Sequence, residues 1–225
     1  MAARPTEPTD ASAPPSLRSP SGEASPLVRA ARAFAARCHG RQRRESDGAA
    51  FIEHPLEVAR LLRDAGCSDT VIAAGLLHDV IEDTQVSAAE LTARFGSAVV
   101  NLVQAVSDDA SIDSYRRRKR LLREQVGRAG TDAALVFAAD KISKVRELPD
   151  LVGRDRARSP TTPLGDRARK QLDHDHQMRL EHYHASLNML QHVVAHHPLT
   201  QRLADELSAC PIVLWSPPIA GRALL

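Results

Sequence analysis

Apolar residues along this chain recur at spacings of three and four, which is the period of one face of an α-helix. The stripe is clearest near the C-terminus, in Leu180, Tyr183, Leu187, Leu190 and Val194. Prolines, glycines and N-capping residues separate the periodic segments. The pattern predicts helices over residues 26–39, 54–66, 71–84, 88–96, 97–106, 131–141 and 166–197.

These segments are rich in alanine, leucine, arginine and glutamate and contain few β-branched runs, so we expect an all-α protein, built as a compact helical bundle. A chain of 225 residues can hold one domain with a substantial core. In chain order we expect a disordered N-terminal tail (1–26), a core (27–150), a linker or mobile loop (151–166), C-terminal helices packed on the core (167–210) and a C-terminal tail (211–225).

The third predicted helix combines an apolar run with ionisable residues. At about 100° per residue its four ionisable side chains fall on one arc of roughly 140°, and apolar residues occupy the other side. These four are His78, Asp79, Glu82 and Asp83. We expect Gly75, one turn earlier on the same side, to leave room for a ligand. A solvated polar face and a chemical site both agree with this pattern.

Two more polar residues occupy positions that local helix structure does not explain. His54 lies at or near the N-cap of the second predicted helix, where Ser, Thr, Asp or Asn is usual. Asp140 ends an apolar helical run, and a salt bridge to Lys144 or a metal ion would satisfy its charge. With His78 and Asp79 these residues supply two imidazoles and two carboxylates. That set fits one divalent cation, such as Mn²⁺, Fe²⁺ or Zn²⁺.

Other polar clusters have simpler interpretations. Many histidines fall in the last predicted helix: His174, His176, His182, His184, His192, His196 and His197. Because Val193 stands where a zincin requires a glutamate base, we expect a structural or surface role for them. The basic run 116–120 is interpreted as a solvated helix end, with phosphate or nucleic-acid contact as the alternative.

Composition narrows the possible partners. The net charge is +2, from 30 basic and 28 acidic residues, which is too balanced to indicate nucleic acid. The 3 cysteines lack CxxC spacing, which favours a reducing, cytoplasmic setting. No apolar stretch is long enough to span a membrane and no apolar signal core is present at the N-terminus, so neither membrane insertion nor export is expected.

Short motifs over about residues 28–148 give a more specific indication. The chain resembles HD-domain phosphohydrolases and, within that superfamily, the hydrolase domain of RelA/SpoT proteins and their small single-domain relatives that degrade (p)ppGpp. The matching motifs are FAARCH (34–39), Gln42 with Arg44, FIEHP (51–55), LLHDVIEDT (76–84), Phe95-Gly96, SDD (107–109) and ADK (139–141) with Arg146.

The resemblance implies a function and a role for each motif. It implies hydrolysis of the 3′-diphosphate of (p)ppGpp by a metal-activated water, which gives GDP or GTP and pyrophosphate. The implied Mn²⁺ ligands are His54, His78, Asp79 and Asp140. The implied catalytic carboxylates are Glu82 and Asp83. The positions expected to contact the substrate are Arg44, Lys141, Lys144 and Arg146.

The chain departs from the family pattern around the nucleotide site. Glu45 replaces a lysine, Ala50-Phe51 replaces Pro-Tyr, Ser143 replaces an aromatic residue and Lys144 replaces an asparagine. Two alternatives therefore stay open: a phosphatase acting on another nucleotide, such as NADPH, and a nucleotide-sensing or interaction domain without turnover. Synthesis of the alarmone is not expected, and the sequence defines no oligomeric state.

Overall fold

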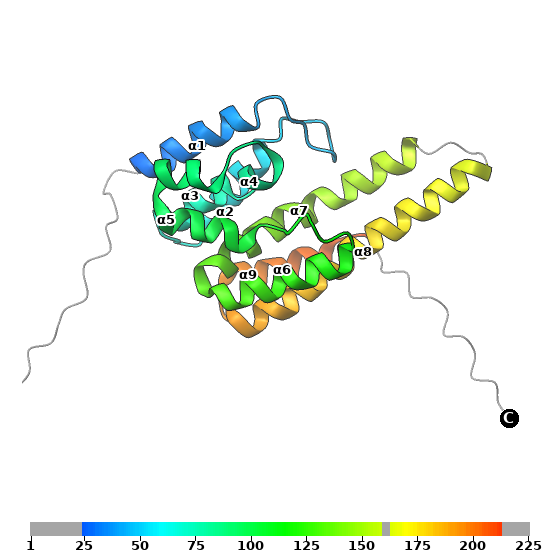
Figure 1. Ribbon diagram of the computed structural model, residues 1–225. Helices are drawn as coiled ribbons and strands as arrows, with labels where there is room; N and C mark the ends of the chain where they lie inside the picture. Colours follow the sequence, from blue (N-terminus) through cyan, green and yellow to red (C-terminus); the bar gives the residue numbers. More distant parts are fainter. Residues whose placement is uncertain (1–23, 159–162, 213–225) are drawn as a thin grey trace, which may run out of the picture.

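The computed structural model describes residues 24–158 and 163–212, and these residues form helices and loops without strands. The helices are α1 (Pro26–Cys38), α2 (Glu53–Asp64), α3 (Asp69–Leu77), α4 (Val80–Asp83), α5 (Ala88–Val106), α6 (Tyr115–Ala129), α7 (Thr131–Arg158), α8 (Pro163–Val193) and α9 (Pro198–Ala209) (Figure 1). The expected all-α bundle is confirmed. Each of the described helices is too short or too polar to cross a membrane. Most of the two predicted tails lies outside the described residues.

Helix α3 lies at the centre of the packing. It contacts α1, α2, α5 and α7, and every residue from Val71 to Leu77 is buried. A helix that is buried on all sides needs no polar face. The expectation of one packed face and one chemical face is therefore wrong for this helix. His78, Asp79, Glu82 and Asp83 all follow its last residue, Leu77.

The helix predicted over residues 71–84 is interrupted at His78 and Asp79. Helix α3 ends just before this pair, and α4 starts just after it. Nδ1 of His78 donates to the carbonyl oxygen of Gly75 over 2.8 Å, and a continuous helix would offer that oxygen to the backbone N–H of Asp79. Asp79 has φ −89° and ψ −6°, away from regular helix values. The prediction of one continuous helix is therefore wrong.

The predicted boundary between helices 88–96 and 97–106 is present as a kink inside α5. Gly96 has a φ of 81°, in the left-handed region that glycine adopts readily. Ser87 caps the first half, because its Oγ accepts from the backbone N–H of Glu90 at 3.1 Å. Local capping and glycine signals therefore placed this boundary correctly.

The linker predicted at 151–166 is helical on both sides of residues 159–162, which lie outside the described part of the chain. The linker prediction is wrong for those helical stretches. Helix α7 continues through Pro149, and Leu151 and Val152 are buried on this helix, which packs along α8. That packing outweighs the cost of a proline inside a helix. Helices α7 and α8 lie side by side and project beyond the other helices (Figure 1).

Gly75 lies against α2 rather than beside a ligand site. A Cβ atom at this position would stand 2.5 Å from Cδ1 of Leu62 and 3.2 Å from Cγ1 of Val58. The expectation that Gly75 leaves room for a ligand is therefore wrong. The missing side chain instead allows α3 and α2 to approach closely, which fixes α3 and the histidine that follows it.

We expect Gly75→Ala to lower the free energy of unfolding by about 1–3 kcal/mol, because the added methyl group overpacks two buried helices. Denaturant unfolding measures this change. Gly127→Ala in α6 is the matched control, because its Cβ would meet Met189 at 3.9 Å, an ordinary contact, and alanine gains up to about 1 kcal/mol of helix propensity. A Gly75→Ala protein as stable as the wild type would contradict the close approach.

Candidate metal centre and adjoining pocket

Three side chains from different parts of the fold converge on one point. His54 lies in the first turn of α2, His78 directly follows α3, and Asp140 belongs to α7. All three side chains are buried. One ligand atom from each lies within 4.8 Å of the others. The sequence placed His54 near the start of its helix, and the structure shows that this position brings it to His78 and Asp140.

The contacts within this group are short. Nε2 of His54 lies 3.2 Å from Nε2 of His78 and 3.2 Å from Oδ1 of Asp140. Asp79 stands beside the group, with Oδ1 3.1 Å from Nε2 of His78 and Oδ2 3.5 Å from Nε2 of His54. Oδ2 of Asp79 and Oδ1 of Asp140 are buried, and among the described residues neither accepts a hydrogen bond. The structure therefore brings all four expected ligands together, Asp79 at the edge of the other three.

Outer hydrogen bonds orient both imidazoles. The carbonyl oxygen of Gly75 can only accept, so Nδ1 of His78 carries the proton and Nε2 of the neutral ring has a lone pair. Nδ1 of His54 is 2.9 Å from Oγ of Ser143, which leaves its Nε2 facing the same centre. Inward-facing imidazole nitrogens with outward hydrogen bonds are the usual arrangement of histidine metal ligands. The donor set fits a divalent cation.

The charges of the group depend strongly on one another. Burial alone would lower the pKa of His78, but the carboxylates of Asp79 and Asp140 outweigh burial and raise that pKa to about 10. Burial would raise the pKa of both carboxyl groups, but His78 and Lys141 hold the pKa of Asp79 and Asp140 below the usual range. The protonated ring of His78 and the ammonium group of Lys141 therefore balance the two carboxylates, and a divalent cation can replace the proton on His78.

Lys141, not Lys144, is the direct partner of Asp140. Nζ of Lys141 donates to Oδ2 of Asp140 over 2.5 Å, and no ion pair joins Asp140 to Lys144 within the described part of the chain. Of the two alternatives for Asp140, a salt bridge to Lys144 or a metal ion, the salt bridge is therefore wrong. Oδ1 of Asp140 stays directed at the imidazoles.

Glu82 and Asp83 follow on α4 and are exposed to solvent. Oε1 of Glu82 accepts from the backbone N–H of Asp108 at 2.8 Å. Partial desolvation by the surrounding protein, together with the negative charge of Asp79, raises the pKa of both side chains, that of Glu82 to about 7. A carboxyl group that titrates near neutrality is suited to accept a proton from water.

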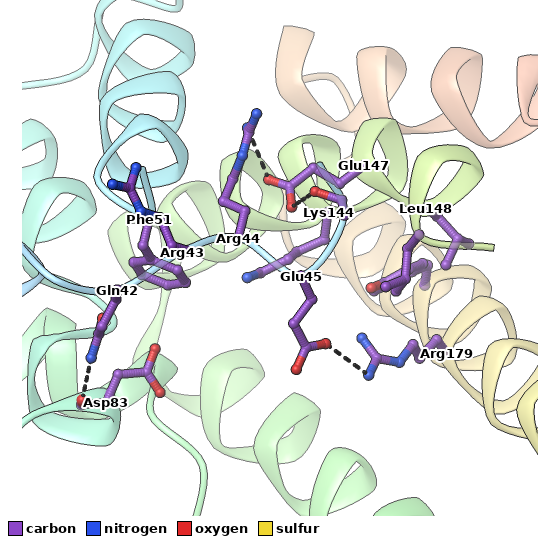
Figure 2. Close-up of a pocket in the computed structure, with 13 residues that line it drawn as sticks. Gln42, Arg43, Arg44, Glu45, Phe51, Asp83, Lys144, Glu147, Leu148 and Arg179 are labelled. Carbon is purple, nitrogen blue, oxygen red and sulfur yellow. Dashed lines mark hydrogen bonds and ion pairs between the residues drawn. The ribbon is translucent and has the colours of Figure 1, made fainter. Parts of the chain in front are cut away.

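A cavity of about 370 Å³ adjoins α4 and is lined by the loop before α2 and by α7 and α8 (Figure 2). Its size is typical of a small-molecule site. Asp83 stands at one side of it. The other charged or aromatic side chains in its wall include Arg44, Glu45, Phe51, Lys144, Glu147, Arg179 and Tyr183.

Lys144 points into this cavity from α7 (Figure 2). Its Nζ lies 5.6 Å from the centre of the Phe51 ring, and it donates no hydrogen bond to the described residues. Burial alone would lower its pKa, but the carboxylates of Asp79 and Asp140 raise the pKa above the usual lysine value. Lys144 therefore carries a positive charge in the cavity and can bind an anionic ligand.

Arg44 is more constrained than the sequence suggested. Its guanidinium is paired with Asp47 and lies 3.5 Å from Glu147. Glu45, its neighbour in the loop, lies 3.8 Å from Arg179 of α8, and this ion pair spans one side of the cavity (Figure 2). Arg44 lines the pocket as expected, but its charge is already engaged.

The other two expected substrate contacts do not line this pocket. Lys141 is buried beside Phe137, with Nζ 4.5 Å from the ring centre. Arg146 points to the other side of α7, where it donates to Oε1 of Glu57 over 2.7 Å and pairs with Glu206. It lines a separate cavity of about 310 Å³.

The histidines of α8 lie outside the convergent group found among the described residues. His176 pairs with Asp155 at 2.9 Å. His182 accepts from Arg123 over 2.7 Å, and burial with nearby cations lowers the pKa of its ring. Both contacts tie α8 to neighbouring helices.

Sequence reasoning missed several residues near the site. The sequence analysis places Arg179 and Tyr183 in a helix that packs on the core, yet both line the cavity. They lie four residues apart, and this spacing would have indicated that they share one face of the helix. Ser143 was noted only as a departure from a family pattern, although it contacts His54. It lies three residues after Asp140 in the same helix, so both side chains share a face.

Fold and site together define an all-helical protein with a buried group of histidines and aspartates whose donor atoms suit a divalent cation. Residues 31–160 match the family model described as HD domain, and the chain belongs to that family. It is 43% identical over 129 residues to guanosine-3′,5′-bis(diphosphate) 3′-pyrophosphohydrolase MESH1 of Homo sapiens, covering 56% of this chain and 71% of that protein.

Two further similarities agree with this family. A probable guanosine-3′,5′-bis(diphosphate) 3′-pyrophosphohydrolase of Synechocystis is 47% identical over 81 residues, which cover 36% of this chain and 10% of that protein. A solved structure described as a metazoan ortholog of SpoT that hydrolyzes ppGpp superposes with a TM-score of 0.62 at 25% identity, covering 86% of this chain and all of the other.

We expect His78→Ala to abolish binding of a divalent cation, because the substitution removes one of the inward-facing nitrogen ligands. It also leaves the buried carboxylates of Asp79 and Asp140 without their contact to this imidazole. Calorimetric titration of the full chain with Mn²⁺ measures the binding. His192→Ala is the matched control, since His192 is exposed on α8 and, in the described part of the chain, its side chain bonds only the carbonyl oxygen of Asn188. Loss of binding in the His192 variant but not in the His78 variant would place the metal on α8 instead.

Proposed function

We propose that this protein is a Mn²⁺-dependent phosphohydrolase that removes pyrophosphate from the 3′ position of (p)ppGpp and leaves GDP or GTP. The observation that carries the proposal is the convergence of His54, His78 and Asp140 beside a pocket lined by Lys144. The printed activity of the similar MESH1 protein supports the choice of substrate.

In this proposal His54, His78, Asp79 and Asp140 hold the cation, which supplies positive charge to polarise a phosphoryl oxygen and activate water. The choice of Mn²⁺ over other divalent cations rests on the family resemblance, since mixed nitrogen and oxygen ligands suit several metals. The tautomers fixed by Gly75 and Ser143 keep the imidazole nitrogens available.

Glu82 and Asp83 act on the attacking water. The backbone N–H of Asp108 holds one oxygen of Glu82, so the other can accept the proton of the attacking water. The water oxygen bonds to the phosphorus attached to O3′, the bond from phosphorus to O3′ breaks, and O3′ takes a proton from solvent. Asp83, at the wall of the pocket, orients the water.

Phosphate groups of the substrate bind Lys144 in the pocket wall, an ammonium group that donates no hydrogen bond to the described residues. Arg44 contributes to the same wall and can reach the nucleotide only by loosening its pairs with Asp47 and Glu147. Neither a nucleic acid nor a membrane is part of the proposal. The free cysteines, Cys38, Cys67 and Cys210, support a reducing, cytoplasmic setting.

A second candidate is a phosphatase that acts on another nucleotide, such as NADPH. Lys144 favours it, because an ammonium group in place of the family's asparagine adds a contact for an extra phosphate. A sensing domain without turnover is less well supported, because Glu82 and Asp83 are both present beside the metal group.

A turnover screen with ppGpp, pppGpp and NADPH in the presence of Mn²⁺ tests the function. We expect pyrophosphate from the two guanosine compounds. Glu82→Gln should bind Mn²⁺ as the wild type does and lose turnover, because an amide cannot accept the proton of water. Phosphate release from NADPH without pyrophosphate release would favour the second candidate, and full activity of Glu82→Gln would overturn the role of Glu82.

We expect Lys144→Asn to raise the KM for the substrate by roughly 10- to 100-fold, the value of one charged hydrogen bond. The metal-binding affinity should change much less, because Lys144 does not contact the ligand atoms. Steady-state kinetics of the two variants Lys144→Asn and Lys170→Asn measure the effect; Lys170 is exposed on α8 and serves as the control. An unchanged KM in Lys144→Asn would remove Lys144 from the binding site.

A further inference from the structure

Ser143 connects the metal group to residues outside it. This serine is fully buried in α7, and its hydroxyl lies between two side chains of α2. Oγ is 2.9 Å from Nδ1 of His54 and 2.7 Å from Oε2 of Glu57. A buried hydroxyl with two partners at these distances makes two good hydrogen bonds.

The direction of these hydrogen bonds follows from chemistry. An ionised Glu57 can only accept, so the hydroxyl of Ser143 donates its one proton to Glu57. The lone pairs of Oγ are then left for His54, whose Nδ1 must donate. His54 is thereby held with its proton on Nδ1 and its lone pair on Nε2, the atom that faces His78 and Asp140.

Glu57 is itself held in place. Nη1 of Arg146 donates to Oε1 of Glu57 over 2.7 Å, and Nε of Arg146 donates to Glu206 over 2.7 Å. Glu206 belongs to α9. The chain of contacts therefore runs from α9 through α7 to α2 and ends at the imidazole of His54. It also gives Arg146 a role, although that residue lies outside the pocket.

Glu147 is the alternative partner of His54. Its Oε1 lies 3.5 Å from Nδ1 of His54, longer than the contact from Ser143 and too long for a good hydrogen bond. Glu147 also lies 3.5 Å from Arg44 and accepts from Oγ of Ser46 at 3.2 Å. The contacts with Arg44 and Ser46 thus fix the position of Glu147 in the pocket wall. Ser143, not Glu147, makes the hydrogen bond with His54.

We propose that Ser143 and Glu57 are positioning residues that fix the tautomer and orientation of His54 and thereby strengthen divalent-cation binding. The inference rests on the proposed role of His54 as a metal ligand. Carboxylates that act on metal-bound histidines commonly do so directly; here a serine hydroxyl transmits the effect. Because Ser143 stands where the family pattern has an aromatic residue, this arrangement belongs to the present chain.

Titration of the metal-free full chain with Mn²⁺ tests the role without relying on turnover. We expect Ser143→Ala and Glu57→Gln each to weaken Mn²⁺ binding by roughly 10- to 100-fold, the usual effect of losing an outer partner of a ligating histidine. Ser186→Ala is the matched control: Ser186 is also fully buried, but its hydroxyl donates to the backbone oxygen of His182. Its Mn²⁺ affinity should equal that of the wild type.

A double-mutant cycle separates a connected chain from two independent effects. The variant with both Ser143→Ala and Glu57→Gln should lose about as much affinity as the more severe single variant. Losses that multiply would show independent effects and overturn the inference. Wild-type affinity in Glu57→Gln would also overturn the inference. The side chain of Glu57 is partly exposed, so this variant is expected to fold even if Ser143→Ala does not.

The same titration distinguishes this inference from the proposed function. A wild-type chain that does not bind Mn²⁺ overturns the proposed metal centre and the positioning role together. Tight wild-type binding with unchanged affinity in both single variants overturns the positioning role alone. Tight binding that weakens in these variants and not in Ser186→Ala supports both.

Discussion

The packing of ionisable groups inside an otherwise apolar helical core is the constraint on which this structure depends. Two imidazoles and two carboxylates lie together where water cannot solvate them well, and such burial is costly unless each charge meets a partner. Lys141 neutralises one carboxylate, and outer hydrogen bonds hold the rings. A divalent cation that replaces the proton of His78 would face the same two carboxylates, which makes the centre suitable for such a cation. The surrounding helices are arranged to keep these groups within reach of one another.

Helix α3 shows how the fold meets that constraint. It is buried on every side, and its position is fixed by the close approach at Gly75, so the residue after its last turn has little freedom. His78 then closes onto the carbonyl oxygen of Gly75 and the regular helix stops. The interruption separates two kinds of residue: the proposed ligands His78 and Asp79 lie inward, and Glu82 and Asp83 on α4 are open to solvent, where water can reach them.

The parts of this architecture that sequence could predict depend on local rules. Helix periodicity, the serine cap at Ser87 and the glycine at Gly96 each act over a few residues, and the predicted boundary there is present. The wrong expectations concern tertiary partners. Sequence spacing offered Asp140 a lysine four residues away, but the fold supplies the adjacent Lys141, and Pro149 stays helical because α8 covers its helix. Which side chain meets which across the core is not encoded in spacing.

The distribution of free and engaged cations decides how this pocket can recognise a ligand. Arg44 is the expected nucleotide contact, yet two carboxylates already hold its guanidinium, and any ligand must compete with them. The pair of Glu45 and Arg179 is largely exposed and therefore weak, so a ligand can displace it at little cost. Lys144 donates no hydrogen bond to the described residues, and the carboxylates of Asp79 and Asp140 raise its pKa. Recognition of an anionic ligand is thus expected to depend on Lys144 more than on Arg44 or Arg179. The departures from the family pattern at Glu45 and Phe51 leave His54, His78 and Asp140 together.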